Sequence, residues 1–337
     1  MKPELHQTLK LIAQDGRNVG TRLSAALGIT RQAASGRLKK LVGRGYVEAT
    51  GATRDRIYSL KPLQEATAAY AIPGPSEDIV WRELCAPLLA DLPMNVRDIW
   101  HYGITEMVNN AIDHSGSPTM RVGMIRNALH TTGWIADDGE GIFMKIQRAL
   151  NLYDPRESII ELAKGKFTTD PAHHTGEGIF FSSKMFDAYD IRSGNLFFMH
   201  DDGELDILTE RNKGGHGTLV MMRIDNASQK TSKAVFDQFS SPDEYTFDKT
   251  IVPVRLAVHE GEKLVSRSQA KRITLRFERF RHVILDFAGV SEIGQAFADE
   301  IFRVFQNAHP TIQMAPTNMT AAVNDMVNRA RNKDARA

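Results

Sequence analysis

The sequence predicts a multidomain α+β protein, and three observations lead to this prediction. First, 337 residues exceed the ~100–200 residues that one hydrophobic core usually serves. Second, the charge is segregated: residues 1–62 carry twelve Lys and Arg against four acidic residues, a net charge of +8, whereas the rest of the chain carries −7. Third, helix and strand patterns form three groups, at 1–62, 79–225 and 246–337, which expected linkers at 63–78 and 226–245 separate.

The composition is that of an ordinary globular protein, with 42% hydrophobic and 25% charged residues. A lone cysteine, Cys85, excludes an internal disulfide and a cysteine-based zinc site, and it fits a reducing compartment. The first residues lack the apolar core of a signal peptide, and no apolar run approaches the ~20 residues that a membrane span needs. We therefore expect a cytoplasmic protein without a membrane partner.

Residues 1–62 begin with three amphipathic helices and end with two short strands. Apolar residues recur at helical spacing in each helix, and Thr30 can cap the third. Segments 45–48 and 56–60 predict two strands around a turn that contains Gly51. The polar face of the third helix carries Arg31, Gln32, Ser35, Arg37 and Lys39.

This order of elements, in the stretch LGITRQAASGRLKKLVGRGYVEATGATRDRIYSL, resembles winged helix-turn-helix domains. In such domains the third helix enters the major groove of DNA and the hairpin contacts the backbone. The resemblance implies a DNA partner, with bases contacted by Arg31, Gln32, Ser35 and Arg37 and phosphates by Arg54 and Arg56. Because one such domain reads a short half-site, specific binding would need a homodimer. The alternative is a winged helix that contacts a protein, with its charges merely solvated.

The central segment contains four motifs with polar residues or glycines at fixed spacing. In the first, EMVNNAIDH at 106–114, Glu106, Asn110 and Asp113 recur at i, i+4 and i+7, so a helix presents them as one stripe. An amide and a carboxylate on one stripe can hold Mg²⁺ and a water beside a phosphate chain. This stripe is the first candidate for a site.

Glycines dominate the other three motifs. In WIADDGEGI at 134–142, a strand ends in an acidic turn with Asp137, Gly139 and Gly141, where glycine permits positive φ and close approach of a ligand. In HTGEGIF at 174–180, Gly176 and Gly178 open a helix whose free N–H groups can bind phosphate. The fourth motif, GGHGTL at 214–219, contains Thr218 and leads into a strand.

Each motif alone is weak, but in this order they resemble the N, G1, G2 and G3 boxes of the GHKL ATPase superfamily over roughly residues 80–225. Within this superfamily, the segments EMVNNAIDHS and GEGIFF most resemble those of the anti-sigma-factor serine kinases. The resemblance implies an α/β sandwich, in which a mixed sheet carries helices on one face, and it implies ATP and Mg²⁺ as cofactors. It also implies an ATP lid between Ile142 and Gly176, with Lys164, Lys166, His173 and His174 in it.

The resemblance also assigns roles residue by residue. Asn110 would coordinate Mg²⁺, and Asp137 would accept the adenine amino group. Glu106 stands where the family has the residue that polarises water in the ATPases, or the acceptor hydroxyl in the kinases. The remaining ATP-binding residues would be Asp113, Gly139, Gly141, Gly176, Gly178 and Thr218.

The last segment reads as an α/β unit, with a buried strand at 281–290, a helix at 291–302, a short strand at 312–314 and a helix at 320–329. It resembles STAS-like domains, and within them a small family of unknown function marked by SRSQAKR and IGQAFADEIF. Anti-sigma-factor antagonists carry a phosphorylatable serine where this chain has Gly294, Gln295 and Ala296. We therefore expect a module for packing or for docking a protein partner.

These patterns support one leading hypothesis and two alternatives. The leading one is an ATP-binding, slowly hydrolysing transcriptional regulator, in which the nucleotide state of the GHKL domain controls the winged helix on DNA. One alternative is a serine kinase in an anti-sigma-like partner switch, and the other is a non-catalytic scaffold. A histidine kinase fits less well, because neither His6 nor His101 has the surroundings of an acceptor histidine.

Overall fold

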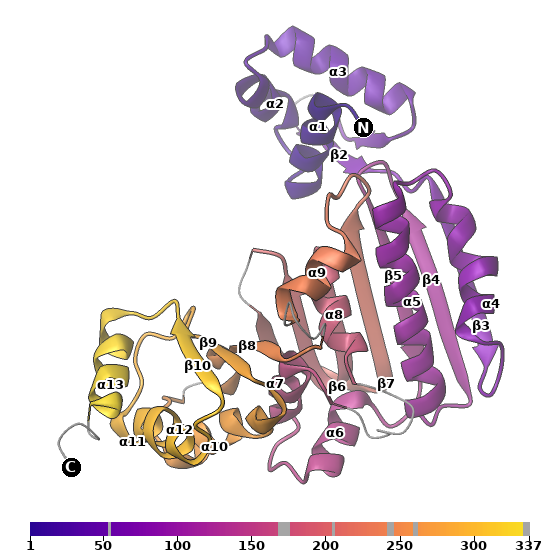
Figure 1. Ribbon diagram of the computed structural model, residues 1–337. Helices are drawn as coiled ribbons and strands as arrows, with labels where there is room; N and C mark the ends of the chain where they lie inside the picture. Colours follow the sequence, from indigo (N-terminus) through magenta and orange to yellow (C-terminus); the bar gives the residue numbers. More distant parts are fainter. Residues whose placement is uncertain (53–54, 168–175, 204–205, 241–245, 259–261, 333–337) are drawn as a thin grey trace.

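The structure is a computed structural model that describes residues 1–337 except 53–54, 168–175, 204–205, 241–245, 259–261 and 333–337. Three units follow one another along the chain, and Figure 1 shows them as a small N-terminal unit above a large central sheet, with the C-terminal unit at the opposite side of that sheet. The protein is mixed α+β. Within the described residues, no helix has the length and apolar character needed to cross a membrane.

The N-terminal unit has the expected three helices and hairpin: α1 (Pro3–Gln14), α2 (Val19–Leu27), α3 (Arg31–Gly43), β1 (Val47–Thr50) and β2 (Ile57–Leu60). The Thr30 side chain caps α3 by accepting from the Ala33 N–H. Gly28 ends α2 in the left-handed conformation, φ +62°, which glycine adopts without strain. A separate small core fills the unit, and its buried residues include Leu9, Ile12, Val19, Leu23, Ala34, Leu38, Leu41 and Val47.

The central unit is a five-stranded sheet in the order β3-β4-β5-β7-β6. Its strands are β3 (Gln64–Ala71), β4 (Thr119–Arg126), β5 (His130–Asp137), β6 (Ala188–Asp201) and β7 (Ile207–Asp225). Every neighbouring pair is antiparallel, so the expectation of a mixed sheet is wrong. The reason is that short connections join β4 to β5 and β6 to β7, and a short connection reverses the chain direction.

Helices cover one face of this sheet, as Figure 1 shows for α5, α8 and α9. The helices of the unit are α4 (Glu77–Val80), α5 (Met94–His114), α6 (Ile142–Leu150), α7 (Glu157–Lys164), α8 (Gly178–Met185) and α9 (Ser232–Phe239), with η2 (Trp81–Cys85) and η3 (Ala86–Leu89) between α4 and α5. Trp100 of α5 is fully buried, and its ring lies edge-on to Phe186 after α8, with ring centroids 4.7 Å apart. The helical layer and the sheet thus share one core.

Both expected linkers contain regular structure. Residues 63–78 hold β3, which pairs with β4 along its whole length, and residues 226–245 hold α9. The sequence of β3, QEATAAYA, lacks the large β-branched residues that mark most strands, so its pairing depends on β4 rather than on its own composition. Pairing with β4 therefore specifies β3, whereas α9 begins at a local signal, the Thr231 side chain that accepts from the Ala234 N–H.

The C-terminal unit is a three-stranded parallel sheet in the order β10-β9-β8. Its elements are β8 (Lys249–Pro253), η4 (Val254–Ala257), α10 (Arg267–Thr274), η5 (Phe277–Arg279), β9 (His282–Asp286), α11 (Gln295–Asp299), η6 (Glu300–Phe305), α12 (Gln306–Ala308), β10 (Gln313–Thr317) and α13 (Ala321–Arg331). The strand expected at 281–290 and the helix expected at 291–302 are present with later or shorter bounds.

One hydrophobic core runs through both the central and the C-terminal units. Aromatic rings cross the boundary: Phe247 lies 4.7 Å from Phe180 of α8 and 5.6 Å from Phe280, measured between ring centroids. Because the two units share a continuous apolar core, we expect them to move together.

Candidate functional site

A cavity of about 390 Å³ lies between α5, α6, α8, the end of β5 and the middle of β7. This volume is within the range of small-molecule sites, ~300–1,000 Å³. Its lining comes from separate stretches of the chain, which the antiparallel sheet and the α5 and α8 helices bring together. The lining residues that the sequence singled out are Glu106, Asn110, Asp137, Gly141, Gly176, Gly178 and Thr218.

Helix α5 supplies the polar side of the cavity. Val108 is buried on the side of α5 that packs into the core, and this packing fixes the rotation of the helix. Glu106 and Asn110 consequently face the cavity one turn apart. The Asn110 amide contacts the Met107 sulfur at 3.9 Å, and the Tyr189 hydroxyl donates to the same sulfur at 3.2 Å.

Asp113 does not line the cavity, although it belongs to the predicted stripe. Its side chain is exposed near the end of α5, and His114 lines the cavity instead. At 100° per residue, Asp113 is rotated about 60° from Asn110 and away from His114. The structure therefore places two members of the predicted stripe at the cavity and the third outside it: the lining follows the i+4 steps from Glu106 to Asn110 and His114, which drift across the helix face.

Asp137 is the last residue of β5, and its side chain accepts hydrogen bonds from two backbone N–H groups. Its Oδ1 accepts from the N–H groups of Gly139, at 2.9 Å, and Thr218, at 3.3 Å. Among the residues that the structure describes, no donor lies on Oδ2, so this oxygen can accept from a ligand. Burial raises the pKa of Asp137, and the two N–H donors act in the opposite direction. The Thr218 hydroxyl in turn accepts from the Ile142 N–H at 3.0 Å, which ties the start of α6 to β7.

The glycines of the cavity are positions where a side chain would collide with a neighbour. A Cβ on Gly141, whose φ is +94°, would be 2.5 Å from the Ser193 hydroxyl. A Cβ on Gly176, whose φ is +72°, would be 2.3 Å from the Phe167 carbonyl carbon. Gly139 does not line the cavity itself but donates to Asp137 from the next turn. The cavity wall is therefore backbone at these points, which suits close contact with a ligand.

Helix α8 begins at the cavity. Gly178, Ile179 and Phe180, its first three residues, all line the cavity wall. The first N–H groups of a helix have no acceptor within the helix, and they carry a partial positive charge. This end of the cavity therefore suits an anion.

Only part of the segment between Ile142 and Gly176, which the sequence predicts to be an ATP lid, lines the cavity. Lys164 ends α7 and is fully buried against the C-terminal unit rather than at the cavity. Lys166 contacts the C-terminal unit as well, and its Nζ donates to the Arg279 carbonyl at 3.1 Å. His173 and His174 lie outside the described residues. The resemblance places Lys164 in the lid by its position in the chain alone, whereas the packing of α7 against the C-terminal unit buries it.

Lys145 and Phe167 are among the lining residues that the sequence motifs did not single out. Lys145 lines the cavity, and its Nζ donates to the carbonyl of His114 at 2.6 Å. Burial lowers the pKa of Lys145. Phe167 also lines the cavity and hydrogen-bonds through its N–H to the Gly176 carbonyl at 3.2 Å. The position of Lys145, one turn into the helix after Gly141, could have indicated it.

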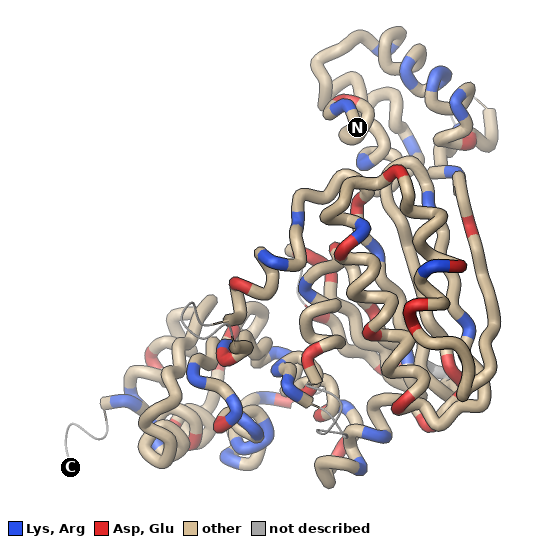
Figure 2. Tube along the Cα trace, turned by 45° about the vertical axis from the view of Figure 1, so that its right-hand side comes forward, with Lys and Arg blue, Asp and Glu red and all other residues tan. Residues whose placement is uncertain are grey.

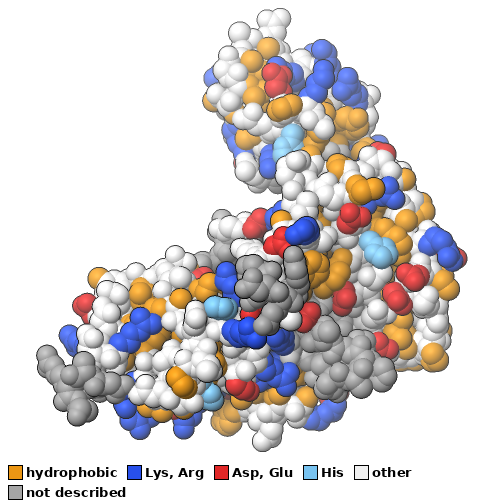
Figure 3. Space-filling view, in the orientation of Figure 1, with side chains coloured by type: hydrophobic (Ala, Val, Ile, Leu, Met, Phe, Trp, Pro, Cys, Tyr) orange, Lys and Arg blue, Asp and Glu red, His pale blue; other side chains and the backbone are white. Residues whose placement is uncertain are grey.

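The predicted DNA-contacting residues lie on the N-terminal unit, where α3 is the helix farthest from the body of the protein (Figures 1 and 2). Arg31, Gln32 and Ser35 of α3 are exposed. Arg37 is partly buried and pairs with Glu4 of α1 at 2.9 Å, so it braces α3 against α1. Arg56 is exposed, and Arg54 lies outside the described residues. Figure 3 shows Lys and Arg side chains gathered on this unit.

The N-terminal unit packs against one end of the central sheet, through Leu129 and Asp225. We call this contact the seat. Leu129, from the turn between β4 and β5, is 5% exposed and belongs to the core of the N-terminal unit. His6 of α1 contacts the Asp225 carboxylate at 2.5 Å, and Lys10 lies 3.8 Å from the same group. Asp225 is the last residue of β7, so the seat is made by the turn and the strand end together.

Two adjacent strands join this seat to the cavity. β5 and the second half of β7 pair residue by residue, from His130 with Asp225 at the seat to Asp137 with Thr218 at the cavity. Eight strand residues span about 25 Å, because each advances the chain by ~3.3 Å. The cavity and the N-terminal unit therefore lie at opposite ends of one hydrogen-bonded ladder.

Comparison with known families identifies one part of the chain. A family model described as a STAS-like domain of unknown function (DUF4325) matches residues 269–324, which run from α10 through β9, α11 and β10 into α13. No curated protein matches the chain. The C-terminal unit accordingly contains a STAS-like domain, as the sequence indicated.

Proposed function

We propose that this chain is an ATP-binding, slowly hydrolysing, DNA-binding regulator, with a GHKL-type fold around the cavity and a winged helix-turn-helix at residues 1–62. The observation that carries the proposal is that residues from all four predicted boxes line one cavity. The convergence of residues from motifs far apart in the chain on one cavity supports a role for them with one ligand. ATP fits the chemistry of both ends of that cavity.

The adenine end would be formed by Asp137 and Thr218. The Asp137 Oδ2 oxygen would accept from the adenine amino group, while Oδ1 stays bound to backbone N–H groups. Ile135, Ile142 and Ile146, which also line the cavity, would cover the faces of the base. An ionised carboxylate here would favour adenine over guanine, because guanine presents a carbonyl oxygen in place of the amino group.

The phosphate end would be formed by α5 and the start of α8. Gly176 and Gly178 would let the free N–H groups of α8 approach the phosphates. The Asn110 amide oxygen is a hard donor of the kind that Mg²⁺ prefers, and phosphate oxygens and water would complete the ion's coordination. Glu106 would accept the proton of the attacking water, and this weak base would give slow hydrolysis.

The N-terminal unit would read DNA through α3. Its net charge of +8 and the exposed Arg31, Gln32 and Ser35 favour a polyanion with a readable groove. The paired β5 and β7 strands would transmit a change at Asp137 and Thr218 to the seat at Leu129 and Asp225. A nucleotide shifts the DNA-binding state only if it binds one arrangement more tightly, and a tenfold preference supplies ~1.4 kcal/mol.

DNA retention with and without nucleotide tests this function. Duplexes selected by the full chain from a random library are titrated with protein in the presence of Mg-ATP, of Mg-ADP and of neither. We expect the apparent Kd to differ at least severalfold between Mg-ATP and the nucleotide-free protein. Replacing Arg31 and Gln32 by Ala should abolish retention, whereas Arg82→Ala, which removes an exposed charge from the central unit, should not. Identical retention under all three conditions would refute nucleotide control.

A further inference from the structure

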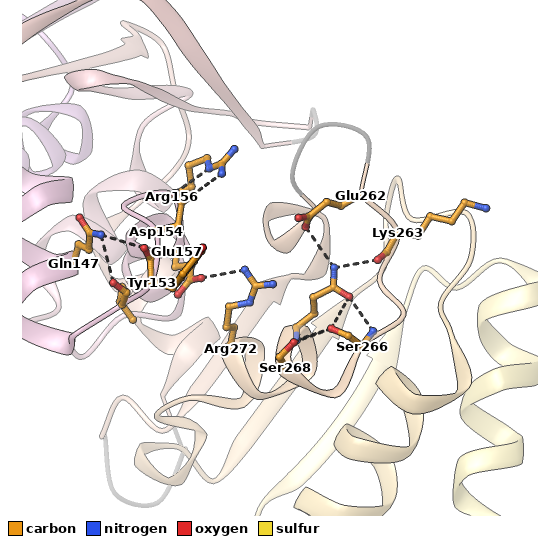
Figure 4. A network of polar contacts seen from close by, with 12 residues as sticks. Gln147, Tyr153, Asp154, Arg156, Glu157, Glu262, Lys263, Ser266, Ser268 and Arg272 are labelled. Atoms are coloured by element: carbon orange, nitrogen blue, oxygen red, sulfur yellow. Dashed lines mark hydrogen bonds and ion pairs between the residues drawn. The ribbon is translucent and has the colours of Figure 1, made fainter.

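Helix α7 and the STAS-like unit share a cluster of buried charges. Glu161 is 1% exposed and accepts at both carboxylate oxygens, from the Lys164 Nζ at 2.5 Å and from the Arg276 Nη1 at 2.8 Å. A neighbouring pair, Glu157 and Arg272, joins the same two units at 3.0 Å (Figure 4). Figure 3 shows Lys and Arg side chains where the central and C-terminal units meet.

Arg276 also holds a short stretch of main chain, Gly165–Phe167, which we call the strap. Its Nη2 donates to the carbonyl of Gly165 at 3.2 Å and to the carbonyl of Lys166. Its guanidinium carbon lies 5.3 Å from the centre of the Phe167 ring. Arg279 adds a donor to the Lys166 carbonyl at 3.0 Å. One arginine of the C-terminal unit therefore contacts all three residues of the strap.

The strap is part of the cavity wall. Gly165 and Phe167 both line the cavity, and the Phe167 N–H donates to the carbonyl of Gly176, which also lines it. Gly176 precedes α8, where the free N–H groups of the helix begin. A movement of the strap would therefore change the end of the cavity that suits an anion.

The backbone at this contact is unfavourable for the residues that adopt it. Arg276 has φ +64° and Lys166 has φ +54°, in the left-handed region that side chains other than glycine rarely occupy. Such conformations persist where the surroundings hold them, and they concentrate at sites of function. A buried ion pair also costs desolvation, so a purely packing role would be served as well by apolar residues. Arg276, which holds the strap, therefore has both an unfavourable backbone conformation and a buried ion pair.

We propose that Arg276 is a positioning residue, through which the STAS-like unit holds the strap against the phosphate end of the cavity and so sets how long a nucleotide stays bound. This inference rests on the proposed ATP site. It gives the C-terminal unit a function: it completes and stiffens a wall of the nucleotide site in the same chain.

Stopped-flow release of a fluorescent ATP analogue, bound with Mg²⁺ to the full chain, tests the proposal. Arg276→Lys keeps a positive charge for Glu161, but a single ammonium group cannot span the carboxylate and both strap carbonyls as a guanidinium does. Loss of a charged hydrogen bond at the strap should raise the dissociation rate about tenfold. Arg279→Gln, at an exposed position, should raise it by a smaller factor, because the Arg279 side chain makes one strap contact.

Arg272→Gln is the matched control. It removes the ion pair with Glu157 from the same interface without touching the strap, so its dissociation rate should stay within about twofold of the wild type. Hydrogen exchange of a peptide that covers 162–167, measured without nucleotide, should be faster in Arg276→Lys than in Arg272→Gln.

The outcomes separate this inference from the proposed function. If the wild type retains the analogue and Arg276→Lys releases it at the wild-type rate, the strap proposal is wrong and the ATP site stands. Equal acceleration in Arg276→Lys and Arg272→Gln would show general loosening of the interface and would also refute it. If the wild type binds no analogue, the proposed function fails, and the strap proposal with it.

Discussion

The carboxylate of Glu106 lies directly against Gly178, the first residue of α8: a Cβ on Gly178 would be 2.0 Å from Oε2 of Glu106. Glycine at this position lets α5 and α8 approach closely. The contact places the expected general base beside the first N–H groups of α8, where the phosphates would lie. Two motifs that are far apart in the sequence thereby act on one end of the cavity.

Gly178→Ala should therefore impair hydrolysis more than binding. The added methyl group must displace the Glu106 carboxylate or push α8 away, and loss of a positioned general base typically costs at least ~100-fold in rate. Phosphate release at saturating Mg-ATP measures the effect. Gly215→Ala is the control, since a Cβ there meets nothing within 4 Å. Hydrolysis by Gly178→Ala at the wild-type rate would show that this contact does not position a general base.

Leu129→Ala should uncouple the N-terminal unit from the sheet. Leu129 fills the core of the N-terminal unit from the turn between β4 and β5, and truncating a buried leucine typically costs ~2–5 kcal/mol. We expect Mg-ATP to bind as in the wild type but to have no effect on DNA retention. Leu63→Ala, at a leucine that is 42% exposed and whose N–H donates to the Arg126 carbonyl at the end of β4, should leave the nucleotide effect intact. A full nucleotide effect in Leu129→Ala would place the coupling elsewhere.

His130 should make stability depend on pH. Burial lowers the pKa of His130 to about 4, and the nearby Arg223 acts in the same direction. The neutral ring is favoured in the folded protein, so its contribution is present above the unfolded pKa of ~6.5 and is lost as pH falls from ~6.5 towards 4, up to about 3 kcal/mol in all. Urea unfolding between pH 7.5 and 4.5 measures this slope.

His130→Gln keeps a side-chain partner for Asn127, whose amide contacts the His130 ring at 3.1 Å. Its unfolding free energy should fall less steeply with decreasing pH than that of the wild type. His216→Gln, which changes an exposed histidine, should keep the wild-type slope. Equal slopes in His130→Gln and the wild type would exclude His130 as the source.

The sequence predicted those parts of the site that depend on local spacing. Glu106 and Asn110 reach the cavity because helical periodicity puts them on one face, and Asp137 does so because a strand ends there. The winged-helix pattern likewise placed the helices of residues 1–62 correctly, since caps and glycines such as Thr30 and Gly28 are local signals.

The remaining features depend on contacts between distant segments. β3 becomes a strand by pairing with β4, and Lys164 is buried because the C-terminal unit covers it. Asp113 lies outside the cavity lining because the elements packed around α5, and not the helix alone, decide which of its residues face the cavity. The contacts of Arg276 could not be predicted from local sequence either, because its partners lie more than a hundred residues earlier in the chain.

Calorimetric titration with Mg-ATP tests the proposed adenine site through its central group, the carboxylate of Asp137. We expect saturable binding to the wild type, much weaker binding of Mg-GTP, and an affinity for ATP that falls about 10- to 100-fold in Asp137→Asn, since a buried polar contact is lost. Asp138→Asn, one residue away and outside the cavity lining, should bind as the wild type does. Equal ATP affinities in the wild type and Asp137→Asn, or no binding by either, would contradict the proposed site.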